Sequence, residues 1–241
     1  MCIRQWQAAI RSVIAAVAAI TAVAACPEMA AVAAEPPSVA VEGLKALYRR
    51  PAIPPAPPEG SIEAARIRLG HLLFFDRRLS STGTVACATC HDPRRAFTDG
   101  GGRGVTGRPT ARAAPTLWNI GFARALFWDG RAGSLEAQIV GPVGSPDEMG
   151  SSLEAIARRL GADRELTADF ARAFPDRGGI DGPAVIAAIV AFERSLVSPP
   201  TRFDRWVEGD ASALDRTELH GFLLFAGKAG CSLCHGGWRF T

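Results

Sequence analysis

The chain has 241 residues, of which 48% are hydrophobic, and its 27 basic and 24 acidic side chains give a formal net charge of +3. This length allows one large domain or two small ones, and the apolar fraction is ordinary for a protein with a buried core. The positive charge is modest, comes almost entirely from arginine and forms no basic run. No nucleic-acid partner is therefore expected.

The first 34 residues are predicted to be a signal peptide. A positively charged start precedes an apolar run at 13–25, which is too short to span a bilayer as a stable helix. Two alternatives remain: lipidation at Cys26, which follows a lipobox-like Val-Ala-Ala, and an uncleaved anchor. All three place the mature protein outside the cytoplasm, and the expected location is the periplasm.

The elements that follow are predicted to be mainly helical. Residues 35–60 are proline-rich and are expected to run extended over the surface, without a regular helix. Ser61 is a good N-cap for a helix that ends near residue 75, and long ordered loops are expected over 76–150. Further helices are predicted at 153–160, at 168–174 with Thr167 as its cap, at 183–196 and at 214–225. No run alternates as a strand would.

A weak internal repeat predicts two domains. Leu-Leu-Phe-Phe at 72–75 precedes a Cys-x-x-Cys-His motif, and Leu-Leu-Phe at 223–225 precedes another, 144 positions later. The sequence thus predicts two cytochrome c-like haem domains. The N-terminal one spans 61–200, and 201–241 is the start of the second.

The cysteines carry the strongest chemical signal. Of six, Cys2 lies in the leader and Cys26 is lost with it or lipidated, and the other four form two motifs. These motifs are Cys87-Ala-Thr-Cys90-His91 and Cys231-Ser-Leu-Cys234-His235.

Each motif has the spacing of a haem attachment site. Two cysteines three apart can form thioethers with the two vinyl groups of one haem, and the next histidine is then held under the iron. Export would also permit disulfides, and two such motifs could supply four zinc ligands. The histidine after each pair favours two covalently bound c-type haems, with His91 and His235 as iron ligands. His71 and His220 are candidate sixth ligands, but are expected to be partly exposed helix residues.

The segments between the motifs resemble the bacterial dihaem cytochrome c peroxidases, MauG-like members included. The resemblance covers about residues 60–241. The matching stretches are Leu69-Gly70, Leu73-Phe74-Phe75-Asp76, Leu79-Ser80, the first haem motif with Asp92-Pro93, Ala96-Phe97-Thr98-Asp99-Gly100, Arg112-Ala-Ala-Pro115-Thr116-Leu-Trp-Asn119 and Phe127-Trp128-Asp129-Gly130-Arg131-Ala132.

The resemblance implies roles for particular residues. The N-terminal haem would react with hydrogen peroxide, and the C-terminal haem would pass electrons. Trp128 would lie between the haems, and Gln138, Pro142 and Glu148 would line the distal pocket of the first. Arg112 would lie near the haem propionates. A calcium ion between the domains is a further cofactor that the resemblance suggests.

The residue types suit this chemistry. Peroxide cleavage moves a proton from one oxygen to the other, which a single carboxylate such as Glu148 can relay. The Gln138 amide can orient the oxidant without adding charge. Taken alone, Glu148 reads as a surface carboxylate and Trp128 as a core residue.

The sequence departs from the family pattern in two places. Some members carry a histidine in the loop after the first motif that blocks the first iron, but 100–112 has none, and Val105 or a neighbour falls at that place. The first iron is therefore expected to be open at rest. The sequence also stops at Thr241, before the family's sixth ligand to the second haem. It is expected to be a C-terminally truncated fragment with an incomplete second domain.

Three functions follow from these residues. The first is a peroxidase that takes electrons from a small periplasmic donor, either a cytochrome c or a cupredoxin. The second is a MauG-like oxidase that modifies tryptophan or tyrosine of a partner protein. The third is a non-catalytic electron carrier. The matches at Gln138 and Glu148 argue against it. A homodimer is one option for assembly.

Overall fold

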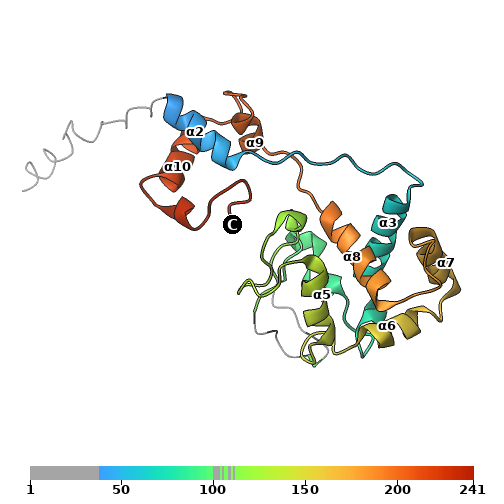
Figure 1. The fold of residues 1–241 in the computed structure, drawn as a ribbon. Helices are drawn as coiled ribbons and strands as arrows, with labels where there is room; N and C mark the ends of the chain where they lie inside the picture. The colour runs from blue at the N-terminus through green and yellow to red at the C-terminus, as the bar shows by residue number, and fades with distance from the viewer. Residues whose placement is uncertain (1–37, 100–103, 105, 108–109, 111) are drawn as a thin grey trace, which may run out of the picture. The chain divides into compact units, whose positions relative to one another are not determined.

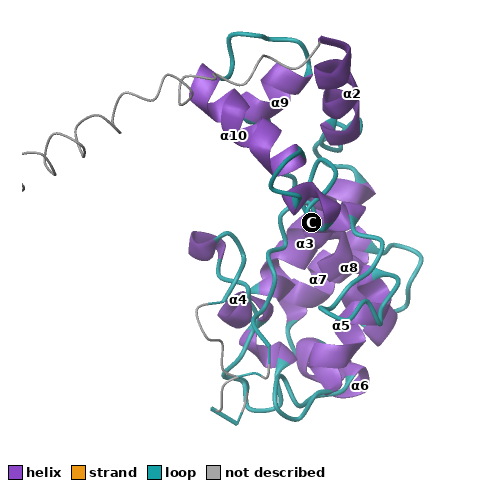
Figure 2. Ribbon diagram, turned by 90° about the vertical axis from the view of Figure 1, so that its left-hand side faces the viewer, coloured by secondary structure: helices purple, strands orange, loops and turns teal. Residues whose placement is uncertain are grey.

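A computed structural model describes residues 38–99, 104, 106–107, 110 and 112–241 of the chain. The predicted signal peptide and Cys26 lie outside these residues. The mainly α fold is confirmed, since the described residues form helices and two isolated bridges but no strand (Figure 2). None of the described helices has the length and apolarity needed to cross a membrane.

The described chain forms two compact units. One is Arg50–Arg216, and in the other the described residues before Arg50, 38–49, pack with Thr217–Thr241. The helices of the larger unit are α3 (Ile62–Phe74), α4 (Cys87–Cys90), α5 (Leu135–Gly144), α6 (Leu153–Leu160), α7 (Arg164–Ala173), α8 (Gly182–Ser195) and α9 (Arg202–Val207). The smaller unit contains α2 (Ser38–Tyr48) and α10 (Arg216–Ala226).

The core of the larger unit is the crossing of α3 and α8, around which α5, α6 and α7 are arranged (Figure 1). Leu69 and Leu73 of α3 and Val185 and Ile189 of α8 are fully buried there. The close approach depends on Gly70, because a Cβ at that position would lie 1.9 Å from the Ala188 carbonyl oxygen. The crossing therefore requires glycine.

Several predicted helix starts are confirmed by their caps. The Ser61 hydroxyl accepts a hydrogen bond from the Ala64 amide, and the Ser152 hydroxyl accepts one from the Ala155 amide, both at 3.2 Å. Each bond satisfies an amide that has no partner within its helix. As predicted, the prolines of 51–58 hold that segment in an extended, irregular conformation.

Two expectations about secondary structure are wrong, and one helix was not predicted. The segment 35–60 contains a helix, α2, because its prolines flank the stretch 38–48 and none lies within it. Loops dominate the described residues of 76–150, as predicted, but the region also contains α5, which buries Leu135, Ile139 and Val143 along one face despite an internal proline. α7 is capped by Asp163 instead of Thr167 and begins three residues before that threonine.

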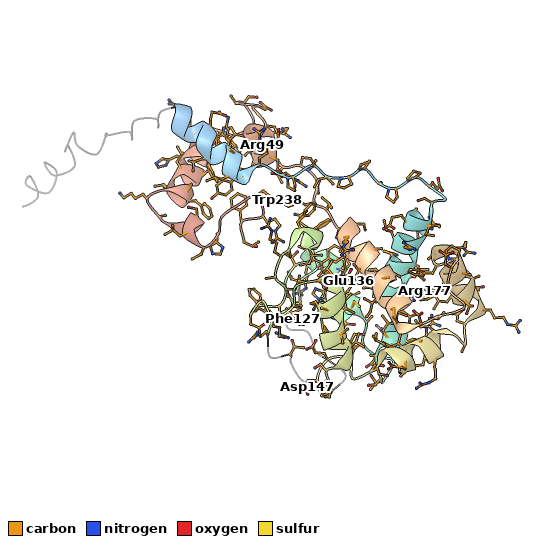
Figure 3. The ribbon with its side chains drawn as sticks, viewed as in Figure 1. Arg49, Phe127, Glu136, Asp147, Arg177 and Trp238 are labelled. Carbon is orange, nitrogen blue, oxygen red and sulfur yellow. The ribbon has the colours of Figure 1, made fainter. Side chains whose placement is uncertain are left out.

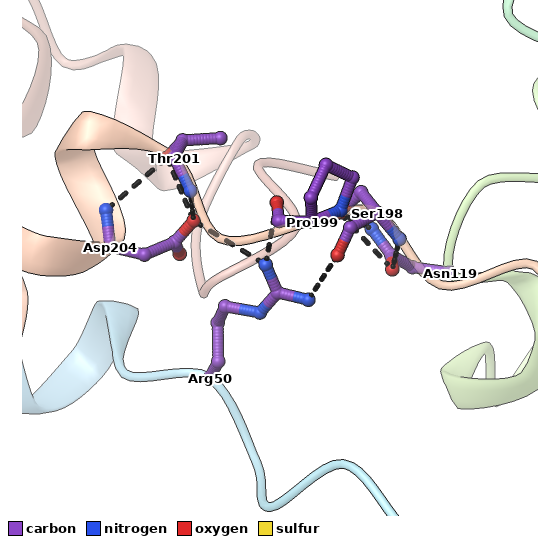
Figure 4. Close-up of polar contacts among 6 residues, drawn as sticks. All are labelled: Arg50, Asn119, Ser198, Pro199, Thr201 and Asp204. Atoms are coloured by element: carbon purple, nitrogen blue, oxygen red, sulfur yellow. Dashed lines mark hydrogen bonds and ion pairs between the residues drawn. The ribbon is translucent and has the colours of Figure 1, made fainter. Parts of the chain in front are cut away.

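A polar network holds the extended segment against the chain that follows α8 (Figure 4). Arg50 donates hydrogen bonds to the Ser198 and Pro199 carbonyl oxygens, at 2.7 and 3.1 Å, and lies 3.4 Å from the Asp204 carboxylate. The Asn119 side chain pairs with both the backbone and the hydroxyl of Ser198. The network thus fixes the exit from α8.

The smaller unit is organised around Tyr48, which is buried at the end of α2. Its ring packs edge-on against Phe222 of α10, with the centroids 5.1 Å apart, and against Phe240 at the same distance. Phe240 in turn contacts Phe225. This aromatic cluster joins α2, α10 and the segment that follows the second haem motif.

Candidate haem sites

The first cysteine motif forms a single helical turn, α4. The His91 amide donates to the Cys87 carbonyl oxygen at 2.9 Å, and the Ala86 amide donates to the Thr89 hydroxyl at the same distance. Cys87 and Cys90 are both half-buried, and neither is in a disulfide. The turn therefore presents two thiols and a histidine from one short rigid element.

The second motif repeats this backbone turn in the smaller unit. The His235 amide donates to the Cys231 carbonyl oxygen, again at 2.9 Å. Cys231, Cys234 and His235 are exposed on that unit. Both motifs thus share this hydrogen bond, although the second forms a 3-10 turn, Cys231–Leu233, where the first forms an α-helical turn.

The His91 ring is oriented for metal binding. Its Nδ1 lies 3.0 Å from the Phe97 carbonyl oxygen. Because a carbonyl oxygen only accepts, Nδ1 carries the proton and Nε2 is left with a lone pair. Burial lowers the pKa of His91, against hydrogen bonds to the Phe97 and Pro115 backbone, and so favours the neutral ring that a metal needs.

The Phe97 carbonyl oxygen that orients His91 is positioned by a strained turn. Ala96 and Phe97 both have positive φ, 54° and 58°, although neither is glycine. Such residues typically cost about 1–3 kcal/mol each and persist where the surroundings enforce them. Here the Thr116 hydroxyl donates to the Ala96 carbonyl oxygen at 2.6 Å, and the Phe97 amide donates to the Asp92 carbonyl oxygen. These hydrogen bonds hold the strained turn in place, and the turn positions the Phe97 carbonyl oxygen that orients His91.

The wall beside α4 is apolar and suits a porphyrin. It is a buried cluster of Phe74, Phe97, Leu117, Phe192 and Leu196, with Cys87, Ala88, Trp118 and Ile120 packed against it. Burial first, and Glu193 second, raise the pKa of the Cys87 thiol to about 12. The residues present therefore fit a haem.

Trp128 lies in a tight turn, between Phe127 and Gly130, that is tied to the segment around Arg112. The indole Nε1 donates to the Ala113 carbonyl oxygen at 2.8 Å, and Arg112 forms a 3.0 Å ion pair with Asp129. Asp129 also pairs with Arg131, and the two arginines lower its pKa to about 2. Trp128 itself is 65% exposed in the larger unit, so it is not a core residue there.

Glu148 lies just beyond α5, where the chain folds back on that helix. The Met149 amide donates to the Pro142 carbonyl oxygen, and the Glu148 amide donates to the Ser145 carbonyl oxygen, both at 3.1 Å. Figure 3 shows Glu136 near one end of α5 and Asp147, the neighbour of Glu148, beyond the other. The two glutamates are therefore separated by the length of the helix.

The Glu148 carboxyl is electrostatically connected to the first haem motif. Burial raises its pKa, against a hydrogen bond from Ser145 and the charge of Arg131. Its own charge contributes, after burial and Asp99, to a raised pKa of the Cys90 thiol. The charge of Glu148 therefore acts on the first haem motif. The Gln138 side chain is half-buried on α5, and within the described part of the chain its amide forms no hydrogen bond.

Two residues near Glu148 were not predicted from the sequence. Gly104 comes so close to the turn before Glu148 that a Cβ there would lie 1.8 Å from the Asp147 carbonyl oxygen. Arg131 stacks on the Phe127 ring, 3.4 Å from its centroid, and a Cβ at Gly141 of α5 would lie 3.0 Å from the same ring. Val105, at which the family's blocking histidine was considered, lies outside the described residues.

The remaining histidines are exposed on helices, as predicted. His71 on α3 packs against Phe75 and Phe192, and His220 lies on α10. Across the described ranges, no group of three or more His, Cys, Asp or Glu side chains is arranged to hold a metal ion by itself.

Comparison with known proteins places these features in a family. A family profile described as di-haem cytochrome c peroxidase matches residues 64–212. The chain is 42% identical to the methylamine utilization protein MauG of Methylorubrum extorquens over 91% of its own length and 63% of that protein's. It is 36% identical to the cytochrome c peroxidase Ccp of Escherichia coli K12, over 79% of this chain and 41% of that protein.

A solved structure agrees. The crystal structure of a MauG-like protein associated with microbial copper homeostasis superposes with a TM-score of 0.68 at 38% identity, covering 76% of this chain and 55% of that one. The chain therefore spans less than two thirds of the length of these relatives. On the profile match and the shared sequence, the chain belongs to the di-haem cytochrome c peroxidase family, whose cofactors are c-type haems.

Proposed function

We propose that this chain is the peroxide-reacting part of a dihaem cytochrome c peroxidase. The haem at Cys87, Cys90 and His91 would react with hydrogen peroxide, and the haem at Cys231, Cys234 and His235 would pass electrons. The single observation that carries this is Glu148, a half-buried carboxyl with a raised pKa whose charge reaches the first haem motif. A plain electron carrier has no use for such a group.

The chain's own residues supply the proton chemistry. When bound, haem supplies an iron that can give two electrons to peroxide. Glu148 would take a proton from one peroxide oxygen and return it to the other, which leaves as water. Gln138 would orient the oxidant by its amide, and Trp128 would carry electrons toward the first haem. His91, fixed by the Phe97 carbonyl oxygen, would hold the iron in place.

The cofactors and partners of this proposal follow the family resemblance. They are two covalently attached haems, a calcium ion, and a small electron donor such as a cytochrome c or a cupredoxin. The location is the periplasm, and Arg112 would lie at the haem propionates. A homodimer is the proposed assembly.

Mixing the oxidised, haem-loaded chain with hydrogen peroxide tests the function. We expect a rapid change in the visible spectrum of the first haem without prior reduction, because no histidine follows that motif in 100–112. Stopped-flow absorbance measures the rate, and electron paramagnetic resonance of the resting protein should show high-spin ferric iron. A chain that is inert to peroxide would be an electron carrier.

A MauG-like oxidase that modifies tryptophan or tyrosine of a partner protein is the second candidate. It is favoured by the 42% identity to MauG and by the exposed Trp128, which could receive electrons at the surface. Mass spectrometry of candidate partners after peroxide treatment separates the two. A stable mass change in a partner favours the oxidase, whereas consumption of electrons from a reduced small donor favours the peroxidase.

Covalent attachment predicts a specific pattern of haem loss. Expressed with a periplasmic haem-ligation system, the chain should gain two haem masses and stay red after acid–acetone extraction. Cys87→Ala and Cys234→Ala should each disrupt one site and leave the other, because the two motifs fold in separate units. Intact-protein mass spectrometry measures this. Bound zinc and no haem would contradict the assignment.

A further inference from the structure

Glu193 is a buried carboxyl that the proposed peroxide chemistry does not use. It lies in α8, is only 5% exposed, and its Oε2 atom has no hydrogen-bond partner among the described residues. An unpaired carboxylate is costly in an apolar interior, and such a group normally stays protonated. Glu193 is therefore a neutral acid inside the protein at neutral pH, and the cost of burying it points to a function.

Its surroundings place it beside the first haem motif. The adjacent Phe192, and Leu196 one turn later, belong to the buried cluster against which Cys87 packs. The charge of Glu193 also contributes to the raised pKa of the Cys87 thiol, so the carboxyl acts electrostatically on the haem attachment site. A haem attached at Cys87 would therefore have this carboxyl as a near neighbour at its attached edge.

Few other charges act on Glu193. Burial first, and then Glu136 of α5, raise its pKa to about 8, against the opposing charge of Arg194. The Cys87 thiol of α4 also faces it, but loses its acidity once it becomes a thioether. No group of the other described elements packed on α8, namely α3, α6 and η5 (Ile120–Phe122), contributes to this shift. The protonation of Glu193 is thus governed mainly by burial.

We propose that Glu193 is a redox-linked proton site of the haem attached at Cys87 and Cys90. At a pH high enough to ionise Glu193 while the haem is oxidised, its carboxylate takes up one proton from solvent when one electron enters that haem, and releases the proton when the electron leaves. The proposal rests on haem attachment at this motif. The physical reason is that an added negative charge strengthens proton binding to a nearby carboxylate, and does so most where the interior is apolar and poorly screened.

This role differs from that of Glu148. Glu148 is only half-buried and interacts with Ser145 and Arg131, and it is proposed to move protons between oxygens of the substrate. Glu193 has neither partner, and it would instead balance the charge of the haem itself. Exposed carboxylates such as Asp129 are screened by water and already paired with arginine, so they are poor candidates.

Potentiometry of the haem-loaded full chain between pH 6 and 10 tests the proposal, with the pH range chosen around the raised pKa of Glu193. In the wild type, the midpoint potential of the first haem should fall with rising pH, by up to about 59 mV per pH unit, which is the tenfold equivalent for one electron. In Glu193→Gln this slope should vanish over that window. The couple of the haem at Cys231 and Cys234 serves as an internal reference and should keep its own pH dependence.

Three further variants assign the group. Glu193→Asp should keep a sloping window, because it keeps a carboxyl. Glu136→Gln should move the window to lower pH without abolishing it, since Glu136 raises the pKa of Glu193. Glu148→Gln should leave the slope in place. The same slope in Glu193→Gln as in the wild type, or a slope lost only in Glu148→Gln, overturns the proposal.

A stability measurement guards against a variant that folds poorly. Because the pKa of Glu193 is raised in the folded chain, its contribution to stability is lost as pH rises through that value of about 8. The wild type should therefore melt at progressively lower temperature as pH rises from about 4.5 to about 8, with no further loss above that, and Glu193→Gln should lack this loss. Peroxide reactivity is a separate result: a reactive chain with a flat midpoint refutes only the role of Glu193, and an inert chain with a sloping midpoint refutes only the proposed function.

Discussion

Gly70→Ala is expected to lower the melting temperature of the chain by about 6–12 °C, which corresponds to a loss of ~3 kcal/mol or more. The new methyl group would lie 1.9 Å from the Ala188 carbonyl oxygen and 2.8 Å from the Phe192 Cβ atom. A backbone carbonyl cannot rotate away as the end of a side chain can, so α3 and α8 must separate. Circular dichroism during heating measures the change.

Gly144→Ala is the matched control for this prediction. Gly144 lies in the last turn of α5 in the same unit, and a Cβ there meets no atom within 4 Å. Alanine is a better helix former than glycine by about 1 kcal/mol, so this variant should melt at or slightly above the wild-type temperature. If Gly70→Ala melts at the same temperature as Gly144→Ala, then α3 and α8 do not cross as closely as the structure shows.

Helix positions were predictable where the sequence carries both a cap and a periodic apolar face. Ser61 and Ser152 mark the starts of α3 and α6, and an aspartate and proline mark the start of α8. α5 was missed because Gly141, Pro142 and Gly144 are typical of loops. It forms because burial of its apolar face outweighs these local preferences.

Hydrogen bonding decided which residue caps α7. Asp163 caps α7 because its carboxylate accepts from two amides, those of Glu165 and Leu166. Thr167, which was predicted as the cap, instead donates its hydroxyl proton to the Asp163 carbonyl oxygen. Two candidate capping residues four positions apart cannot be ranked from sequence spacing alone.

Some residues of the candidate site could be predicted from the sequence and others could not. The cysteine and histidine motifs were readable because haem attachment demands adjacent residues. The carbonyl oxygen that orients His91 was not readable, since it depends on left-handed conformations at Ala96 and Phe97, which the sequence does not favour. Glu193 gave a weak signal as a lone acid at the end of an apolar run, but only the packing of α8 beside Cys87 shows that it is buried next to the haem motif.

Glu148→Gln is expected to slow the reaction of the first haem with hydrogen peroxide by about 10²–10⁴-fold, the usual contribution of a general acid–base group. Glutamine keeps the size and polarity of the side chain but cannot accept and return a proton. Haem content and the resting spectrum should not change, because Glu148 is proposed to contact the oxidant and not the iron. Stopped-flow absorbance after mixing with peroxide gives the rate.

The pH dependence provides a second signature of the same residue. The carboxylate must be ionised to accept a proton, so the wild-type rate should fall as pH falls through the pKa of Glu148. Because burial raises that pKa, the fall should begin at higher pH than for an exposed glutamate. In Glu148→Gln the remaining slow rate should not show this fall.

Glu136→Gln is the control for both measurements. Glu136 lies in the first turn of the same helix, 2.9 Å from Arg194 at the surface, and is separated from Glu148 by the length of α5. Its loss should leave the peroxide rate and its pH dependence nearly unchanged. If Glu148→Gln reacts at the wild-type rate while Glu136→Gln does not, the proton relay has been assigned to the wrong end of α5. If both react at the wild-type rate, neither carboxyl relays the proton, and the electron-carrier function gains support.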